Sequence, residues 1–271
     1  MENTPTYSNW KQDHQGFLET LTGKHVFVLF SGGCDSSLAL SLISRAGQEF
    51  GFDLEAHGAA FPVHRYTEAE KAKLSTFWNQ RGVTIGWHTL AESDKALEEA
   101  QDPCLVCQGV RKEMLRDSLP RFVRTWEDLV LVTSFSLWDL ASYTMEHLLA
   151  DLSSTPEQGD APGKNKRLME TAQRFYPSLK MKEGYTVFRP LIRYNGNDIL
   201  RQVEKQGIPT LSIPCRYQAS RPKRILERYH ERMALRLDYE RLLAFAKRCL
   251  NLPRSSSFTA MEKDRYLGHI F

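Results

Sequence analysis

Short apolar runs alternate with amphipathic segments through the first half of the chain. The apolar runs predict β-strands at His25–Phe30, Leu54–Phe61, Val83–Leu90 and Leu129–Ser134. Helical spacing of apolar residues predicts α-helices at Ser37–Ala46, Glu68–Gln80, Val110–Ser118 and Leu140–Leu152. Strands that alternate with helices are typical of a mainly parallel sheet with helices on both faces. The sequence therefore predicts a Rossmann-like α/β fold, in which ligands bind at the carboxyl ends of the strands.

The pattern changes after residue 152. Ser153–Lys166 is polar, contains Pro and Gly, and shows no periodicity, which is typical of a flexible surface insertion. We expect this insertion to extend over 153–184. Apolar patterning returns at Tyr185–Ile192, and a helical segment follows from about 197 to 206.

Length and composition indicate a globular protein. The 271 residues suffice for one large α/β domain and a small appendage, which we place at 1–215 and 216–271. Apolar residues make up 41% and charged residues 25%, as in globular proteins generally. No apolar run approaches the roughly 20 residues that cross a bilayer, and the first residues lack the plan of a secretory signal. We therefore expect a cytoplasmic protein without membrane attachment.

A glycine motif joins the first predicted strand to the first predicted helix. It reads Ser31-Gly32-Gly33-Cys34-Asp35-Ser36 and continues with Ser37. Gly32 and Gly33 allow successive N–H groups to point into one concavity, to which the following helix adds the positive end of its dipole. Ser36 and Ser37 can donate hydrogen bonds, and Asp35 can hold Mg²⁺ on a polyphosphate. The motif predicts a phosphate site; an ordinary turn between strand and helix is the alternative.

The cysteines provide a second candidate site. They lie at positions 34, 104, 107, 215 and 249, an odd number that argues against a secreted disulfide scaffold. Cys104 and Cys107 form a CxxC pair, which fits a zinc half-site, a redox dithiol or two cluster ligands. Two unrelated buried thiols are the alternative. A turn precedes the pair and a helix with Arg111 and Lys112 follows, and a helix N-terminus favours thiolates. This context favours a functional cluster.

A basic segment lies near the C-terminus. Between residues 216 and 248 there are ten Lys or Arg and four Asp or Glu. Helical spacing places on one face Arg221, Arg224, Arg228, Arg232 and Arg236. It places on another face Leu226, Tyr229, Met233 and Leu237. The apolar face would dock on the domain, and the arginines would suit RNA phosphates. A solvated face, partly neutralised by neighbouring acids, is the alternative.

The segment Ser31–Ser36 matches SGGxDS, the signature of the PP-loop ATP pyrophosphatases, without a departure. The chain therefore resembles this superfamily. The resemblance implies the fold of the adenine nucleotide alpha hydrolases and the use of ATP with Mg²⁺. It also implies cleavage of ATP to AMP and pyrophosphate, with the substrate adenylated on an oxygen.

Other motifs resemble the tRNA 2-thiocytidine synthetase group of this superfamily. They are Pro103–Lys112 with its CxxC pair, Phe188-Arg189-Pro190-Leu191, Asp198-Ile199 and Ile213-Pro214-Cys215, so that the similarity runs from about residue 24 to residue 225. The resemblance implies that Cys104, Cys107 and Cys215 hold a [4Fe-4S] cluster, with one iron that has no protein ligand. An open iron of this kind can bind a sulfide and present it to an activated substrate.

The chain departs from that group after the fourth predicted strand. Where the group has a GHxxDD block, residues 132–139 read VTSFSLWD, so the histidine is missing and Asp139 is the acid that remains. Asp139 is therefore a candidate catalytic residue, and the departure leaves the substrate open. The group often has a further cysteine after the IPC triplet, which this chain lacks. That absence leaves the three-cysteine cluster intact.

Together these features predict an ATP-dependent sulfur transferase that thiolates a tRNA base or another nucleobase. Sulfide or a persulfide-carrying protein would donate the sulfur, and a homodimer is compatible with the sequence. The loop residues for the nucleotide are Ser31, Gly32, Gly33, Asp35, Ser36 and Ser37. The candidate substrate contacts are Arg111, Lys112, Arg189, Arg221, Arg224 and Arg228. Three alternatives stay open: thiolation of a small molecule, an amine ligase with structural zinc completed by Cys249, and a non-catalytic nucleotide-binding regulator.

Overall fold

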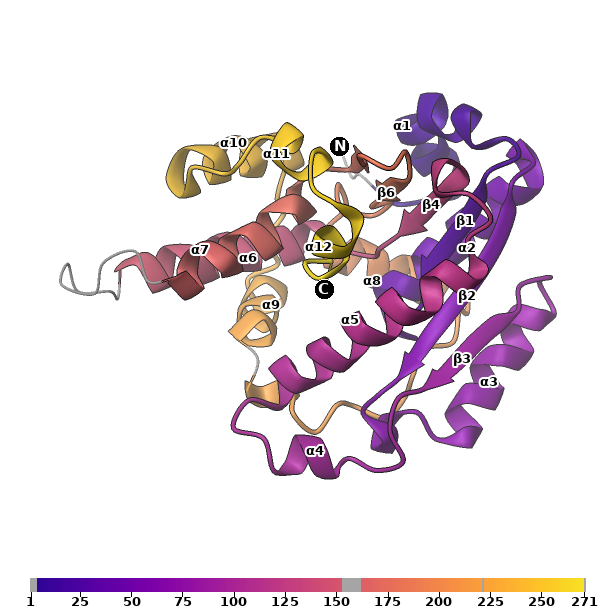
Figure 1. Cartoon of the computed structure of the whole chain (residues 1–271), viewed down its shortest axis with the longest axis horizontal. Helices are drawn as coiled ribbons and strands as arrows, with labels where there is room; N and C mark the ends of the chain where they lie inside the picture. Colours follow the sequence, from indigo (N-terminus) through magenta and orange to yellow (C-terminus); the bar gives the residue numbers. More distant parts are fainter. Residues whose placement is uncertain (1–3, 153–161, 221, 271) are drawn as a thin grey trace.

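The computed structural model describes residues 4–152, 162–220 and 222–270, and its centre is a six-stranded sheet (Figure 1). Its strands are β1 (His25–Leu29), β2 (Asp53–Ala60), β3 (Ile85–Thr89), β4 (Leu129–Val132), β5 (Ser178–Lys180) and β6 (Thr186–Phe188). Their order is β3-β2-β1-β4-β6-β5, and all neighbours are parallel except β5 and β6. The strand order reverses direction between β1 and β4, where open α/β sheets bind their ligands. The mainly parallel sheet predicted from the sequence is confirmed.

Two hydrophobic cores lie on opposite faces of the sheet, because successive side chains of a strand point to opposite faces. Val26 and Val28 of β1 belong to one core, and Phe27 belongs to the other. The first core is closed by α1 (Tyr7–Leu18), α2 (Cys34–Phe50), α3 (Glu68–Asn79) and α8 (Gly196–Lys205). The second is closed by α5 (Pro103–Phe122), α6 (Leu137–Leu152), α7 (Pro162–Ala172), α10 (Tyr239–Leu250), α11 (Ser255–Thr259) and α12 (Lys263–Leu267).

The second core joins the C-terminal extension to the sheet domain. Tyr239, Phe258 and Tyr266 from the extension are buried in the same core as Leu131 of β4 and Val187 of β6. The extension also includes α9 (Pro222–Arg232), which packs against α6. The extension therefore cannot be separated from the sheet domain without exposing apolar surface.

Part of the expected insertion at 153–184 lies outside the described residues, namely 153–161. The remainder contains α7, a 3₁₀ turn (Gln173–Phe175) and β5, which pairs with β6 at the edge of the sheet. None of the described helices is long and apolar enough to cross a membrane.

Candidate nucleotide and cysteine site

The glycine motif forms a tight loop between β1 and α2, at the carboxyl end of β1. Gly32 has a φ of +71°, which side-chain-bearing residues rarely adopt. A Cβ at Gly32 would lie 2.8 Å from the Leu211 Cγ. The backbone carbonyl of Gly32 also accepts a hydrogen bond of 2.8 Å from the Leu211 N–H. Both the conformation and the close contact therefore require glycine at this position.

The start of α2 can receive an anion. Gly33 is the N-cap of the helix and no side chain caps it, so that the first N–H groups lack the partner that a cap would supply. The Ser31 and Ser36 hydroxyls lie 3.0 Å apart at the loop, and Asp35 lies in the first turn. These features fit the phosphates of ATP. Ser37 is fully buried, so a contact of its hydroxyl with phosphate stays a prediction.

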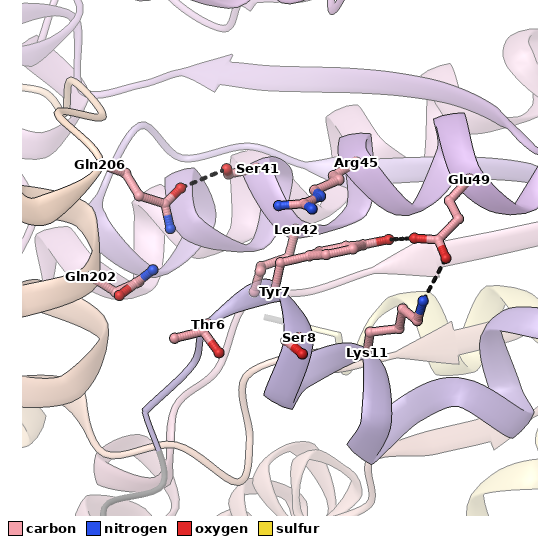
Figure 2. Close-up of a pocket in the computed structure, with 10 residues that line it drawn as sticks. All are labelled: Thr6, Tyr7, Ser8, Lys11, Ser41, Leu42, Arg45, Glu49, Gln202 and Gln206. Carbon is pink, nitrogen blue, oxygen red and sulfur yellow. Dashed lines mark hydrogen bonds and ion pairs between the residues drawn. The ribbon is translucent and has the colours of Figure 1, made fainter.

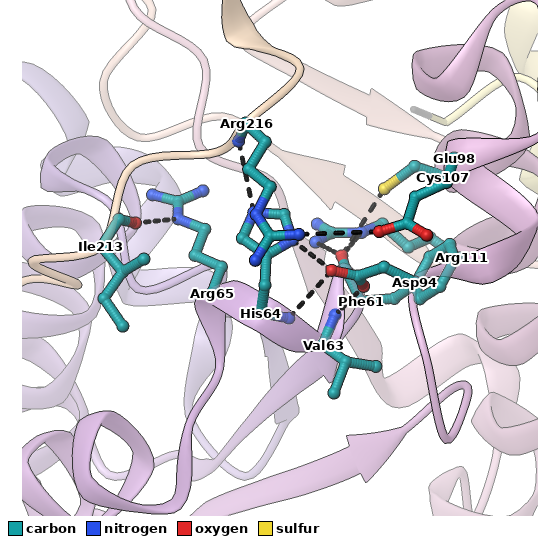
Figure 3. A network of polar contacts seen from close by, with 10 residues as sticks. All are labelled: Phe61, Val63, His64, Arg65, Asp94, Glu98, Cys107, Arg111, Ile213 and Arg216. Carbon is teal, nitrogen blue, oxygen red and sulfur yellow. Dashed lines mark hydrogen bonds and ion pairs between the residues drawn. The ribbon is translucent and has the colours of Figure 1, made fainter.

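A chain of polar contacts connects the loop to the CxxC pair. The Tyr66 hydroxyl donates to the Ser31 carbonyl at 3.0 Å and accepts from the Arg111 guanidinium at 3.3 Å. Arg111 also donates to the Phe61 carbonyl, which lies 3.5 Å from the Cys107 Sγ (Figure 3). Burial alone would lower the pKa of Arg111, but the neighbouring Tyr66 and Cys107 raise it. Arg111 is therefore a fixed positive charge between the nucleotide loop and Cys107.

Cys104 and Cys107 lie in the first turns of α5, which begins at Pro103, before the predicted helix start at Val110. The Asp102 carboxylate accepts hydrogen bonds from the Cys104 and Leu105 N–H groups at 2.9 and 3.0 Å. This cap starts the helix at Pro103, a residue that is favourable in the first helical turn. Both cysteines are half-buried, and neither forms a disulfide with another described residue.

The segment with Cys215 lies against the same region. The Ile213 carbonyl accepts from Arg65 at 3.1 Å, and the Arg216 N–H donates to His64 at 3.2 Å (Figure 3). Two residues after Cys215, the Tyr217 carbonyl lies 4.0 Å from the Cys104 Sγ. The structure therefore brings the segments of Cys104, Cys107 and Cys215 together across more than a hundred residues.

The three thiols supply the donor chemistry that an iron–sulfur cluster needs. Within residues 4–152, 162–220 and 222–270, however, no three His, Cys, Asp or Glu side chains already form a metal-binding group. Cys249 is exposed on α10. The three cysteines have the side chains that an iron–sulfur cluster needs and lie on neighbouring segments. Their assembly as its ligands stays a prediction.

His64 and Asp94 support the Cys215 segment. The His64 Nδ1–H donates to the buried Asp94 carboxylate, which also accepts from the Val63 N–H at 2.6 Å. Burial alone would raise the pKa of Asp94, but hydrogen bonds from His64 and Val63 lower it. Asp94 and Tyr66 were not predicted from the sequence. They follow the carboxyl ends of β3 and β2, at the edge of the sheet where ligands bind, and this position is the signal that could have indicated them.

Arg189 does not contact substrate, contrary to the sequence prediction. It is fully buried and donates to the Tyr176 carbonyl at 2.8 Å, to the Tyr266 hydroxyl at 3.0 Å, and to the Gln173 side chain. These partners come from the chain itself, and burial leaves no access for an external phosphate. Arg189 therefore holds the second core together.

Asp139 and Lys112 have partners within the chain. The buried Asp139 carboxylate accepts from the Ser136 N–H at 2.6 Å and from its hydroxyl at 2.8 Å, which caps the start of α6. Lys112 lies 3.3 Å from the Glu170 carboxylate of α7. In the structure Asp139 caps α6 and Lys112 pairs with Glu170. The catalytic role of Asp139 and the substrate contact of Lys112 stay predictions.

The predicted basic helix is shorter, and its buried face differs from the predicted one. Arg221 lies outside the described residues, and α9 ends at Arg232, so that Arg236 pairs with Asp198 instead, at 3.4 Å. Tyr229 and Met233, which were expected to dock, are exposed, whereas His230 is buried against α6. Arg224 pairs with Glu227 at 2.9 Å and Arg228 is exposed.

A separate cavity of about 620 Å³ lies between α1, α2 and α8 (Figure 2). It is open and lined mainly by polar side chains, which include Tyr7, Lys11, Arg45, Glu49 and Gln202. Glu49 binds the Tyr7 hydroxyl at 2.7 Å and Lys11 at 2.6 Å. None of the loop or cysteine residues lines this cavity, so it is separate from the candidate site.

The fold is similar to that of known enzymes, although no family model and no curated protein sequence matches the chain. One similar structure is the U34-tRNA thiolase NcsA from Methanococcus maripaludis with its [4Fe-4S] cluster. Its TM-score is 0.63 at 16% identity, and the match covers 92% of this chain and 81% of that chain.

Two other structures match with lower scores. NMN synthetase from Francisella tularensis has a TM-score of 0.49 at 9% identity, over 90% of this chain and 93% of that chain. NH₃-dependent NAD synthetase from Campylobacter jejuni has a TM-score of 0.43 at 15% identity, over 95% and 98%. The match to the thiolase, at a TM-score of 0.63, shows that the chain has a Rossmann-like α/β fold, as predicted from the sequence. At these identities the similarity establishes the fold.

Proposed function

We propose that this protein is an ATP-dependent sulfur transferase that thiolates a base of tRNA. The observation that carries the proposal is the path of contacts from the Ser31 carbonyl through Tyr66 and Arg111 to the Phe61 carbonyl, which lies 3.5 Å from the Cys107 Sγ. This path supports the proposal, because it connects the thiol pair with a loop suited to ATP, so that activation and sulfur delivery could occur at one site. The tRNA thiolase with the similar fold also carries a [4Fe-4S] cluster, which supports the choice.

The loop would perform the activation. The N–H groups at the start of α2 and the Ser36 hydroxyl would hold the phosphates, and Asp35 would hold Mg²⁺. The base oxygen attacks the α-phosphorus of ATP, and the bond from this phosphorus to pyrophosphate breaks. A sulfide-level sulfur then bonds to the base carbon, and AMP leaves with the oxygen. Each step exchanges one bond for another, without an external oxidant.

Cys104, Cys107 and Cys215 would hold the [4Fe-4S] cluster, which would supply an iron that binds sulfide. The described thiols do not already form a ligand group. We therefore expect loading to draw the Cys215 segment toward α5. The Tyr217 carbonyl, two residues after Cys215, already lies 4.0 Å from the Cys104 Sγ.

Purification without oxygen, followed by iron, sulfide and zinc analysis, tests this proposal. Cys215→Ala should lose iron, the brown visible absorbance and sulfur transfer to tRNA, but should keep ATP binding. Cys249→Ala is the matched control, because Cys249 is exposed on α10, and it should keep all four. Zinc without sulfide in the wild-type protein would instead support the amine ligase, and full activity of Cys215→Ala would refute the cluster.

A further inference from the structure

The outward face of α9 carries an exposed apolar ridge. Ile225, Tyr229 and Met233 are 60%, 55% and 56% exposed. They are spaced four residues apart, so their side chains are neighbours along the helix surface. Met233 lies one residue past the end of α9 and continues the helical pattern, because its N–H donates to the Tyr229 carbonyl at 3.0 Å. Such a ridge of large exposed apolar side chains indicates a contact surface.

Arginines line this ridge. Arg228 and Arg232 are exposed and lie three residues after Ile225 and Tyr229, respectively, so they share the face of the ridge. Among the described residues neither makes an ion pair, whereas Arg224 is paired with Glu227. The opposite face of α9 is the one that packs on α6, where His230 lies 3.4 Å from the Ser142 hydroxyl. The exposed face thus combines apolar contact with positive charge.

The start of α9 lies close to the candidate cysteine site. Figure 1 shows α9 between α6 and the start of α5. Just before α9, the Tyr217 carbonyl approaches Cys104 of α5. A chain molecule lying along α9 would therefore have one end near Cys104.

We propose that this ridge binds an unpaired stretch of the RNA substrate, with a base stacked on Tyr229 and phosphates held by Arg228 and Arg232. The proposal rests on the proposed function, which makes RNA the substrate. A duplex presents phosphates and riboses and hides the faces of its bases, so it would leave the apolar side chains uncovered. A single strand presents bases for stacking and phosphates for arginines on the same side.

Fluorescence anisotropy with the full chain tests the proposal, without ATP or cluster. The probe is a labelled RNA of about 12 unpaired nucleotides, within the length that single-strand binding surfaces cover. Tyr229→Ala should weaken binding about 5- to 100-fold, the loss typical of one stacked base, and Tyr229→Trp should restore it. Arg228→Gln and Arg232→Gln should each reduce the salt dependence by about 0.7 in logarithmic slope.

Matched controls lie on α10, where Phe245 and Arg248 are also exposed. Phe245→Ala and Arg248→Gln should bind the RNA as the wild type does. The proposal is overturned if Tyr229→Ala keeps wild-type affinity, or if the same RNA binds equally well as a duplex. It is also overturned if Tyr229→Ala abolishes self-association instead, which would assign the ridge to a second copy. Failure to thiolate RNA with binding intact would count against the proposed function alone.

Discussion

At the scale of single residues, Tyr66 connects the two parts of the candidate site. Its hydroxyl is shared between the Ser31 carbonyl of the nucleotide loop and Arg111 of the cysteine helix. Tyr66→Phe keeps the ring and removes both contacts. We expect it to weaken ATP binding about 2- to 10-fold, because one net hydrogen bond contributes about 0.5–1.5 kcal/mol.

Calorimetric titration with ATP checks this prediction. Tyr176→Phe is a suitable control, since its hydroxyl donates to the Pro253 carbonyl at 2.7 Å, away from the loop. The control should lose a comparable hydrogen bond and keep its ATP affinity. Equal affinities in the wild type and Tyr66→Phe would show that the loop holds its shape without this contact.

His14 should make the protein sensitive to acid. Burial lowers its pKa to about 4, although the Pro190 carbonyl at 3.2 Å opposes the shift. In the unfolded chain His14 binds a proton below about pH 6.5, but in the folded chain it does so only below about pH 4. The free energy of unfolding that depends on neutral His14 is therefore fully present above pH 6.5 and is lost as the pH falls toward 4. The expected loss from this group is about 3 kcal/mol.

His14→Phe should remove this part of the pH dependence. The Pro190 carbonyl keeps a hydrogen bond from the Trp10 indole at 3.0 Å, so that the variant leaves it satisfied. Urea unfolding at pH 7 and pH 4.5 measures the difference between the two proteins. If the wild type and His14→Phe lose the same free energy of unfolding between these pH values, His14 is not the group that causes the loss.

At the scale of elements, substitutions at the two glycines that flank α2 can distinguish the cost of an unfavourable φ from the loss of ATP binding. Gly32 and Gly51 have similar φ values, +71° and +70°, but a Cβ would meet Leu211 at Gly32 and nothing within 4 Å at Gly51. Gly51→Ala should cost about 1–2 kcal/mol of unfolding free energy and keep ATP binding. Gly32→Ala should cost more and abolish ATP binding.

Thermal unfolding and ATP titration of both variants check this expectation. The double variant Gly32→Ala, Leu211→Ala removes the contact with Leu211 and leaves the unfavourable φ. Adding Gly32→Ala to Leu211→Ala should therefore cost less unfolding free energy than adding it to the wild type. ATP binding by Gly32→Ala at wild-type affinity would contradict the assignment of the loop to the nucleotide.

At the scale of the whole molecule, Arg189 joins the sheet to the C-terminal helices. It links β6 to Gln173 and to Tyr266 of α12 inside the second core. Arg189→Met should reduce the unfolding free energy by at least about 2 kcal/mol, because hydrogen bonds from a charged donor are lost. The folded variant should bind RNA normally. A stable variant with weak RNA binding would revive the substrate contact predicted from the sequence.

The parts of the fold that could be predicted depend on local patterns. Buried parallel strands such as β1 and β4 are continuous apolar runs, and the loop at Gly32 follows from adjacent glycines between a strand and a helix. The start of α5 was predicted at Val110, after the CxxC pair, although Asp102 and Pro103 are local signals of a helix start at Pro103. Helix α1 was missed, since its pattern is largely polar and its buried Trp10 is recognisable only from its partners.

The sequence by itself determined the order of the first four strands and the main helices between them, the glycine loop after β1 and the presence of the CxxC thiols, since each depends on residues that are neighbours in the chain. Only the tertiary structure decided which segments meet. It placed Leu211 on Gly32, Tyr66 between the loop and Arg111, and the segment of Cys215 beside α5. It also buried Arg189 and turned Tyr229 outward, because burial is set by packing among distant segments, which no local periodicity encodes.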